Sequence, residues 1–443
     1  MSGVRVPLRP PNSSLGFLEA WRKGRNVVLG RTLGRVVVVT AMFGASALTS
    51  GAAAGSSHFE LSLEFTSDQF TILEVDESGL VGSPDGHVTF IRENGSVRFW
   101  APVNGGTVEL ATTDFYDLHA MSDPVVEVLE PSGSGDAFDS EYAGGSKVLR
   151  LPDGRLAMIY HGEHHPCTGD KAEVTIGLAL SSDDGVTWER QGAIVSAPDW
   201  NFGSCAERSF YGAGSFSAVV SPDRTYVYLY FNQWVPGDSA ITKVARARIS
   251  TGLTPGTWFK YHAGRWNEPG LGGRADDVLP VPGTPIDQEW SSVAIPSVSW
   301  NTDYQMWLAV FVSVTGFWYS SSSDGLHWSV PRSLLDDVVL FSPRSLVDHQ
   351  QYIYYPSLID VSANEDGRTS REGLLIYAQG GWTAAHHMVG RNVRISRIDV
   401  PGLPVTGRDG DRKSWWSWGT LAAGVAVLLV RRRWQVDPRR PTR

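Results

Sequence analysis

The residues best suited to chemistry lie in a few segments in the middle of the chain, where histidines, carboxylates and aromatic residues occur together. The densest segment is 161–167, His-Gly-Glu-His-His-Pro-Cys. The candidates for ligand contacts are His161, Glu163, His164, Arg208, Trp234, Glu289, His349, Tyr355 and Trp382. Tryptophan offers a flat apolar face to a sugar ring, and polar side chains can bond its hydroxyl groups. This set therefore favours carbohydrate binding.

A metal centre is not expected at the histidine cluster. The spacing of His161, His164 and His165 is loose, and no further cysteine is free to complete a zinc site. Hydrogen bonds to a substrate, or an ordinary surface loop, are the two interpretations that remain. No cofactor is predicted, and Ca²⁺ in a central channel stays open.

The segments that must position these residues are marked by turns at intervals of about 70 residues. One series is clearest at 181–188 (SSDDGVTW) and 321–328 (SSSDGLHW). A degenerate copy lies at 250–258, and further copies are predicted at 112–117 and 394–399. The other consists of 84–86, 152–154, 222–223, 302–303 and 365–367. Proline, aspartate and glycine suit turn positions, so each turn is expected to join two strands as a hairpin.

Five such repeats predict an all-β fold, a five-bladed β-propeller with four-stranded antiparallel blades over residues 56–402. A unit of this length cannot bury its own faces, and five of them account for the chain between its ends. A β-sandwich is the alternative. In a propeller both turn series lie on one face, so the candidate ligand residues should gather on the opposite face.

The two ends of the chain differ from the middle. Residues 1–55 are expected to be an export signal, because basic residues precede an apolar stretch at 36–48 and small residues follow at 52–54. An uncleaved anchor is the alternative. Residues 403–443 contain Leu-Pro-Val-Thr-Gly, an apolar run at 415–430 and three arginines at 431–433. A C-terminal membrane anchor is one interpretation of this end, although 16 residues are few for a crossing.

The middle of the chain is acidic. The whole chain has 38 basic and 47 acidic residues. Residues 1–40 contain seven basic residues and one acidic residue, and residues 408–443 contain nine basic and three acidic residues. Residues 41–407 therefore carry 22 basic against 43 acidic residues, a balance of minus 21. Such a surface argues against nucleic acid as a partner, and confines any membrane contact to the C-terminal segment.

The chain has two cysteines, Cys167 and Cys205. An even number in an exported domain predicts a disulfide, and both lie on the face that carries the candidate ligand residues. Two free thiols are the alternative.

Residues 70 to 400 resemble the five-bladed propeller glycosidases, the group that includes glycoside hydrolase family 43, and the turn at 181–188 resembles the Asp-box of sialidases. In the later copy of this turn, Ser323 is interpreted as the replacement for the box aspartate. The C-terminal end resembles the cell-wall sorting signal of Gram-positive surface proteins. That resemblance implies a sortase as partner and cleavage between Thr406 and Gly407. The usual long spacer is missing, and the protein body faces outward on either interpretation of this end.

The family 43 resemblance implies three acidic residues at the inner-strand entrances of successive blades, acting as base, pKa modulator and acid. By position these would be Asp76 or Glu77, then Asp139 or Glu141, then Glu207, and we take Asp76, Glu141 and Glu207 as the candidates. A true sialidase is a minority interpretation, because the usual Arg-Ile-Pro entry is absent from the first blade.

The sequence thus predicts an exported, surface-anchored glycoside hydrolase that uses paired carboxylates in the channel. A non-catalytic carbohydrate-binding propeller, a lectin or adhesin, is the alternative.

Overall fold

The computed structural model describes residues 58–73, 84–103, 105–120, 127–166, 172–198, 210–235, 242–279, 282, 295–340, 351–381 and 384–400. The contacts divide the chain into two units, Met1–Thr40 with Phe59–Asp399, and Ala41–His58 with Val400–Arg443. The predicted export signal, sorting signal and C-terminal apolar run lie outside the described residues. Within the described part, no helix has the length and apolar character needed to cross a membrane.

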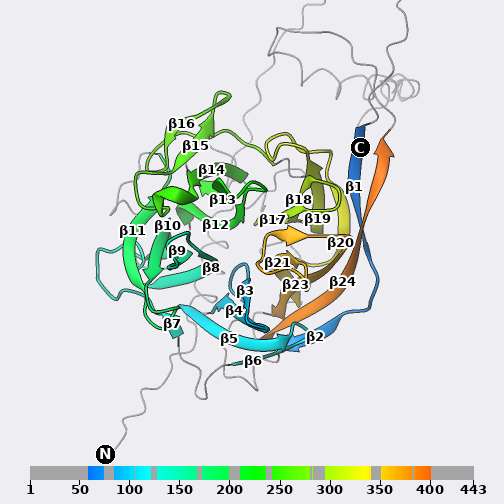
Figure 1. Ribbon diagram of the computed structural model, residues 1–443, viewed down its shortest axis with the longest axis horizontal. Helices are drawn as coiled ribbons and strands as arrows, with labels where there is room; N and C mark the ends of the chain where they lie inside the picture. Colours follow the sequence, from blue (N-terminus) through cyan, green and yellow to red (C-terminus); the bar gives the residue numbers. More distant parts are fainter. Residues whose placement is uncertain are drawn as a thin grey trace, which may run out of the picture. The chain divides into compact units, whose positions relative to one another are not determined.

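The first two groups of strands follow the expected antiparallel order. The first blade consists of β3 (Thr89–Glu93), β4 (Ser96–Pro102), β5 (Thr107–Asp114) and β6 (Asp117–Ala120), with β7 (Glu127–Leu129) beside β5. The second blade consists of β8 (Tyr142–Arg150), β9 (Leu156–His164), β10 (Ala172–Ser181) and β11 (Glu189–Val195). Figure 1 shows the groups placed one after another around a common centre.

The third blade is longer than predicted because it ends in an additional hairpin. It consists of β12 (Phe210–Val220), β13 (Tyr226–Trp234), β14 (Thr242–Arg248), β15 (Phe259–His262) and β16 (Arg265–Pro269), with a short 3-10 helix, η1 (Ile249–Thr251), after β14. Residues 172–174 of β10 pair in parallel with residues 210–212 of β12, which joins the second and third blades into one nine-stranded sheet.

The fifth blade combines strands from both ends of the described chain. The fourth blade consists of β17 (Ser297–Asn301), β18 (Met306–Ser313), β19 (Gly316–Ser322) and β20 (Arg332–Asp336), with β22 (Arg368–Thr369) beside β17. The fifth consists of β21 (Tyr352–Ile359), β23 (Glu372–Gly381), β24 (Ala384–Val400) and β1 (His58–Phe65), with β2 (Phe70–Leu73) beside β24.

Hydroxyl groups link the inner strands at four of the five junctions between neighbouring blades, and the pairing of β10 with β12 joins the second blade to the third. In each link a side-chain oxygen of one inner strand accepts an amide proton from the next: Val148 to Thr89, Val298 to Ser217, Leu358 to Ser297 and Val88 to Ser357, at 2.9 to 3.1 Å. The last of these joins the fifth blade back to the first. The chain is therefore a closed five-bladed β-propeller, as predicted.

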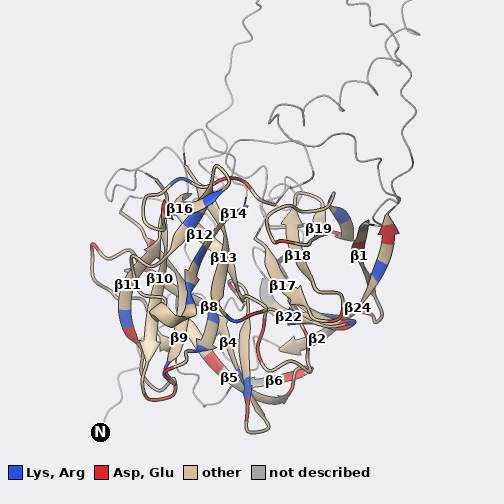
Figure 2. Cartoon of the chain, turned by 45° about the horizontal axis from the view of Figure 1, so that its top comes forward, with Lys and Arg blue, Asp and Glu red and all other residues tan. Residues whose placement is uncertain are grey.

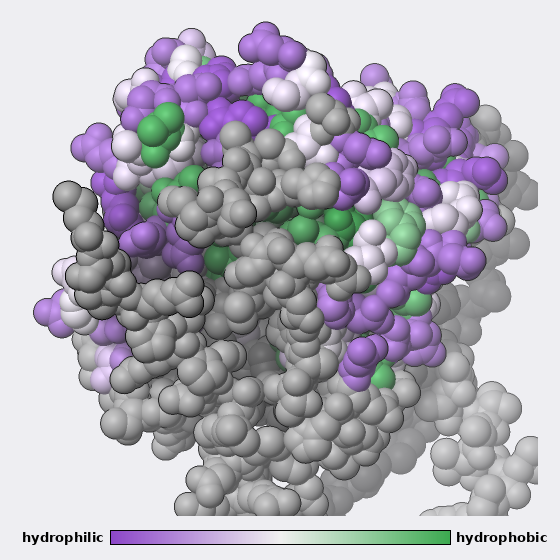
Figure 3. All heavy atoms as spheres, turned by 90° about the horizontal axis from the view of Figure 1, so that it is seen from below, coloured by the Kyte–Doolittle hydropathy of each residue, from purple (hydrophilic) through white to green (hydrophobic). Residues whose placement is uncertain are grey.

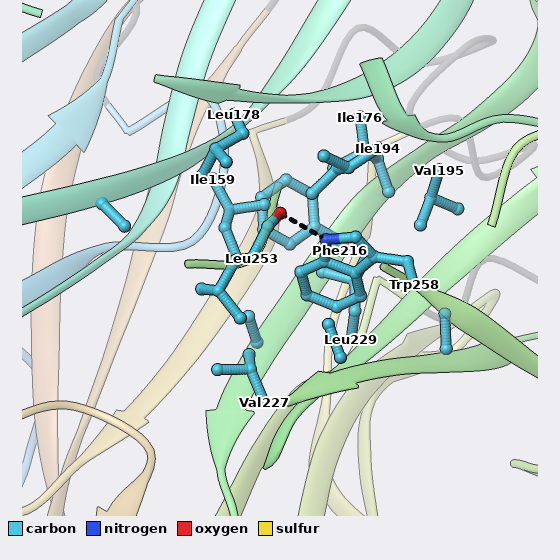
Figure 4. Packing of buried hydrophobic residues seen from close by; sticks show 14 of the residues in the cluster. Ile159, Ile176, Leu178, Ile194, Val195, Phe216, Val227, Leu229, Leu253 and Trp258 are labelled. Atoms are coloured by element: carbon cyan, nitrogen blue, oxygen red, sulfur yellow. Dashed lines mark hydrogen bonds between the residues drawn. The ribbon is translucent and has the colours of Figure 1, made fainter. Parts of the chain in front are cut away.

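Hydrophobic side chains fill the spaces between neighbouring blades. A large cluster between the second and third blades is drawn in Figure 4, and Ile159, Leu178, Phe216, Leu229 and Trp258 belong to it. The indole Nε1 of Trp258 donates to the carbonyl of Leu253 at 2.8 Å, so burial of this ring leaves no polar atom unpaired.

Most of the predicted turns are confirmed. Strand pairs are joined at 112–117, 152–154, 181–188, 222–223, 250–258, 302–303 and 321–328, and 365–367 lies in the connection from β21 to β23. Two predictions are wrong. The segment 84–86 leads into β3, and the hairpin of the first blade is instead Asn94-Gly95, a two-residue turn with φ of 53° and 84°.

The second wrong turn is 394–399, which lies inside β24. No turn is needed there, because β1 provides the fifth blade with its outer strand. The amide of Thr66, just after β1, donates to the carbonyl of Asn392 at 2.9 Å.

The later Asp-box also differs from its prediction. In the first copy, Asp183 accepts hydrogen bonds from the hydroxyl of Ser181 and the amide of Thr187. In the later copy, Asp324 accepts the corresponding bonds from Ser322 and from the amide of His327. The box aspartate is therefore present but shifted by one residue, and Ser323 does not replace it.

The connection from β21 to β23, residues 360–371, closes one end of the ring. It contacts each of the four other blades. Arg92 of the first blade donates to the carbonyls of Val361 and Ala363, and Lys147 of the second blade pairs with Asp366. Arg368 donates to the carbonyl of Ser221 in the third blade, and Asn301 of the fourth blade donates to the carbonyl of Ser370. We call these twelve residues the plug. The inner strands begin at the other end of the ring, where the candidate site lies.

The described surface is predominantly polar. Acidic and basic residues are interspersed over strands and turns (Figure 2), and hydrophilic side chains predominate among the coloured atoms of Figure 3. Large hydrophobic side chains that are exposed in the described part are Tyr116, Val186, Phe259, Leu271 and Val330.

Candidate active site

Asp85 lies just before the innermost strand of the first blade, four residues ahead of β3. Its amide donates to the carbonyl of Pro102 at 2.9 Å, and its own carbonyl accepts from the hydroxyl of Tyr142 at 2.9 Å. Burial raises the pKa of Asp85 most, and the negative charge of Glu163 raises it further. Hydrogen bonds from Tyr142 and Tyr355 lower it, but the pKa still reaches about 8. Asp85 is therefore a carboxylic acid that keeps its proton at neutral pH.

Tyr355 reaches Asp85 from the fifth blade on a strained backbone. Its φ is +50°, unusual for an aromatic residue, and the pairing of β21 with β23 is shifted between Tyr354 and Ser357. This bulge directs the Tyr355 side chain towards the first blade. The ring of Tyr354 packs against it with centroids 4.8 Å apart. Such strain is found chiefly where the surrounding structure holds a residue for function.

Tyr142 reaches the same carboxyl from the second blade. It starts β8, and its ring lies over Gly144, where an added Cβ atom would overlap the ring. Glycine is thus required at 144 to leave room for this ring. The pairing of β8 with β9 is shifted between Gly145 and Lys147, which gives this inner strand a bulge as well.

Glu163 is the second carboxylate of the site, near the end of β9 and opposite Tyr142 in the strand pairing. Its two oxygens lie 3.0 Å from Nε2 of His161 and 2.8 Å from Nε2 of His165. Burial alone would raise the pKa of Glu163, but the hydrogen bonds from the two histidines outweigh burial and hold it at about 2. Glu163 is therefore ionised beside a neutral Asp85, and the two environments push the pKa values apart.

A third blade contributes through its backbone. The amide of Ser215 on β12 donates to Nδ1 of His161 at 3.1 Å. Ser215 has φ of +42°, at a shift in the pairing of β12 with β13, and the neighbouring Gly214 leaves space for the imidazole. The described site thus draws on the first, second, third and fifth blades.

His87 follows Asp85 by two residues and is buried. Its Nδ1 lies 3.4 Å from the hydroxyl of Ser357, and its buried Nε2 has no hydrogen-bond partner among the described residues. Burial lowers the pKa of His87 to about 4, so the ring is neutral.

Glu141 and His164 lie on the opposite face of the second blade from Glu163. Residues alternate between faces along a strand, so His164 points away from His161 and Glu163. Its Nδ1 is 2.8 Å from the hydroxyl of Ser140 and 3.3 Å from Glu141, whose carboxylate also accepts from the amide of His165 at 3.0 Å. In the described part of the chain, Glu141 bonds to Ser140, His164 and His165 and not to Asp85. Asp139, the other candidate for the second blade, bonds Tyr160 and Arg190.

The structure therefore brings together some of the predicted residues. His161, Glu163 and Tyr355 share one site. Trp234 is 6% exposed and packs against Ala172 and Val174, so its contact with sugar stays a prediction. Asp76, Cys167, Cys205, Glu207, Arg208, Glu289, His349, Trp382, Thr406 and Gly407 lie outside the described residues.

No group of three or more His, Cys, Asp or Glu side chains in the described ranges could hold a metal ion. Calcium in the channel is untested by this observation, because several segments of the candidate face are not described.

Sequence reasoning missed Asp85 and Tyr142. A signal was nevertheless present, because Tyr142-Ala-Gly-Gly-Ser146 and Tyr211-Gly-Ala-Gly-Ser215 have the same spacing of tyrosine, glycine and serine. Both runs occupy the start of an inner strand, and both contain a bulge. The repeat of a tyrosine followed by glycines marks where side chains need space at the centre of the ring.

Comparison with protein-family models gives no match, and comparison with curated proteins gives none either. Among solved structures, the chain is similar to the catalytic domain of the Coprinopsis cinerea GH62 α-L-arabinofuranosidase, with 12% identity over 76% of this chain and 97% of that chain and a TM-score of 0.44. It is also similar to the Podospora anserina α-L-arabinofuranosidase in complex with cellotriose, with 11% identity over 76% and 97% of the two chains and a TM-score of 0.42.

A third similar structure is the family 43 glycoside hydrolase YxiA of Bacillus licheniformis, with 13% identity over 73% of this chain and 75% of that chain and a TM-score of 0.40. Identities and TM-scores this low assign neither a family nor an activity to the chain.

Proposed function

We propose that this protein is a glycoside hydrolase that cleaves a poly- or oligosaccharide at the mouth of its channel. The observation that carries the proposal is Asp85, a half-buried carboxyl at an inner-strand entrance whose pKa is raised to about 8. Glycosidic cleavage requires one carboxyl that keeps a proton for the leaving oxygen. Asp85 is in that state at neutral pH, beside an ionised carboxylate.

Asp85 is proposed as the proton donor. The resemblance to family 43 gives the base to the first blade, so this assignment departs from it on account of the raised pKa. Glu163 is a poor proton donor, because both of its oxygens are bonded by histidines and its pKa is about 2. Its fixed charge instead adds to the effect of burial in raising the pKa of Asp85. The base that activates water is proposed to be Glu207.

The stereochemical outcome depends on the separation of the donor and the base. Carboxyl groups about 6.5 to 9.5 Å apart leave room for a water and invert the anomeric centre, whereas a separation of about 5 to 5.5 Å implies retention. The remaining candidates, Arg208, Glu289, His349 and Trp382, are proposed to bind the sugar, with the hydroxyl of Tyr355 contributing from the described site.

Hydrolysis of a panel of nitrophenyl glycosides by the full chain tests the proposal. We expect cleavage of at least one glycoside, and a loss of about 100-fold or more in kcat for Asp85→Asn and for Glu207→Gln. Asp153→Asn, in an exposed turn of the second blade, is the matched control and should retain activity. Binding of sugar without cleavage of any glycoside would instead identify the protein as a lectin or adhesin.

Export and anchoring are part of the proposal and rest on the sequence. Residues 1–55 would direct export, a sortase would cleave between Thr406 and Gly407, and Cys167 would pair with Cys205. Mass spectrometry of the mature protein tests all three, because it reports both chain ends and the mass change on reduction. An intact C-terminus in the mature protein would favour the plain membrane anchor.

A further inference from the structure

His161 is held in a single protonation pattern by its two ring nitrogens. The amide of Ser215 can only donate, so Nδ1 of His161, 3.1 Å away, must accept and carries no proton. The proton of the neutral imidazole is therefore on Nε2, which lies 3.0 Å from Glu163. Nε2 donates to that carboxylate.

The surroundings also fix the orientation of the ring. On one side the bulge at Ser215 presents its amide, and on another Gly214 lies so close that a Cβ atom there would overlap the imidazole. The ring of Tyr142 meets His161 edge to face, with centroids 5.6 Å apart and planes at 88°. A bulge, a glycine and a tyrosine from two blades therefore converge on one histidine, which is more than a surface ion pair needs.

We infer that His161 is a positioning residue, whose Nε2–H, directed by the backbone amide of Ser215, keeps Glu163 ionised and oriented beside Asp85. His165 bonds the other oxygen of Glu163 at 2.8 Å and completes the arrangement. The third blade thereby controls a carboxylate of the second blade, which in turn acts on the carboxyl of the first. Only the effect on rate rests on the proposed function, because the tautomer and the ionisation can be measured without a substrate.

Five titratable groups in the described part of the site interact with Glu163. They are His161 and His165 on its own strand, Asp85 before β3, Tyr142 on β8 and Tyr355 on β21. Of these five groups, only the two histidines donate hydrogen bonds to Glu163. Losing one histidine therefore removes one of the two hydrogen bonds that stabilise the ionised carboxylate.

Nuclear magnetic resonance on the full chain tests the inference. Nitrogen-15 shifts of the histidines report the tautomer, and carbon-13 labelling of glutamate side chains reports the ionisation of Glu163. The variants are His161→Phe, which keeps a ring but has no donor, and His161→Gln, whose amide can still donate to Glu163. His262→Gln is the matched control, because His262 pairs with Asp276 at 2.8 Å on the outer hairpin of the third blade.

The expected results are specific to the inferred role. His161 should show the Nε2–H form, and Glu163 should stay ionised from pH 4 to pH 8 in the unmodified chain and in His262→Gln. In His161→Phe the titration midpoint of Glu163 should rise into that range, and His161→Gln should restore much of the low value. An Nδ1–H form, or a Glu163 titration that is the same in all variants, would overturn the inference.

The rate provides a second readout. If the chain hydrolyses a glycoside, His161→Phe should lower kcat about 10-fold or more with a smaller change in KM, and should move the acidic limb of the pH profile upward. His161→Gln should recover part of both. A change in thermal stability with an unchanged pH profile would mean that His161 is only structural. A chain without hydrolytic activity that still shows the expected titrations would defeat the proposed function and leave the inference intact.

Discussion

Asp85 was expected in a hairpin turn but lies in the candidate active site, because its role depends on its place in the fold. Pro-Asp-Gly at 84–86 has the composition of a turn, and its interval to the next such turn matches the repeat. In the structure it enters an inner strand, where burial and the charge of Glu163 act on the carboxyl. Composition is the same in both settings, so only the tertiary surroundings distinguish them.

The raised pKa of Asp85 makes stability depend on pH. The folded state holds this proton up to about pH 8, whereas the unfolded chain releases it near 3.8. The folded state thus binds more protons between these values, and stability falls as pH rises through that window, by up to about 1.4 kcal/mol per pH unit. We expect Asp85→Asn to flatten this slope in denaturant titrations from pH 4 to pH 8.

Glu163 acts in a different pH window, whereas the lowered pKa of His87 makes stability rise with pH between about 4 and 6.5, in the unmodified chain and in Asp85→Asn alike. The pKa of Glu163 is about 2, below the ordinary 4.5. Its ionised form therefore stabilises the fold above pH 4.5, and this stabilisation is lost as the pH falls from 4.5 to about 2. The control Asp153→Asn should keep the slope of the unmodified chain. A slope that persists unchanged in Asp85→Asn would show that the buried proton is held elsewhere.

The hydroxyl of Tyr355 is predicted to matter for Asp85 more than for folding. Removing it in Tyr355→Phe takes away a hydrogen bond that lowers the pKa of Asp85, so that pKa should rise further. The free energy of unfolding should fall by about 1 kcal/mol. Carbon-13 titration of the aspartate side chains measures the first effect and denaturation the second. A lower pKa in Tyr355→Phe would contradict this geometry.

At the scale of elements, hairpin turns were the part of the fold most accessible from sequence. Their residues have backbone preferences of their own, so the turns after β8, β10, β12, β17 and β19 could be placed. The bulges at Ser215 and Tyr355 could not, because serine and tyrosine have no preference for positive φ. The site was therefore predictable at the level of its face and of His161, Glu163 and Tyr355, but not in the contacts that organise it.

The shifted Asp-box provides a prediction at this scale. Asp324→Ala should lower the free energy of unfolding by about 1 kcal/mol, because it removes the acceptor for the amides of Leu326 and His327. Ser323→Ala is the matched control, since this exposed neighbour is not the box residue. Thermal unfolding of both variants decides the assignment. A larger loss for Ser323→Ala would restore the register expected from sequence.

At the scale of the whole molecule, the plug holds the blades at the end of the ring away from the site. Its centre is the ion pair of Lys147 with Asp366, 2.9 Å apart, and the Lys147 side chain is fully buried. The hydroxyl of Thr89 also donates to Asp366 at 2.6 Å. Neither the pair nor the plug was visible in the sequence, because residues 147 and 366 come from the second and fifth blades and meet only in the closed ring.

Breaking this pair should be costly. Lys147→Met leaves a buried carboxylate without its cation, and we expect a loss of about 3 to 5 kcal/mol in the free energy of unfolding. The double variant with Asp366→Asn should lose less than Lys147→Met alone, because no uncompensated charge remains. Chemical denaturation of the two single variants and the double variant measures the coupling. Independent, additive effects would show that the pair does not act as a unit.

The pH dependence of kcat/KM for glycoside hydrolysis, compared between the unmodified chain and Asp85→Asn, tests the central claim most directly. A proton donor with a pKa of about 8 predicts that kcat/KM falls as the pH rises through that value, and that this limb disappears with the carboxyl. A kcat/KM that rises through pH 8, or full activity in Asp85→Asn, would contradict the assignment of Asp85 as the acid of this site.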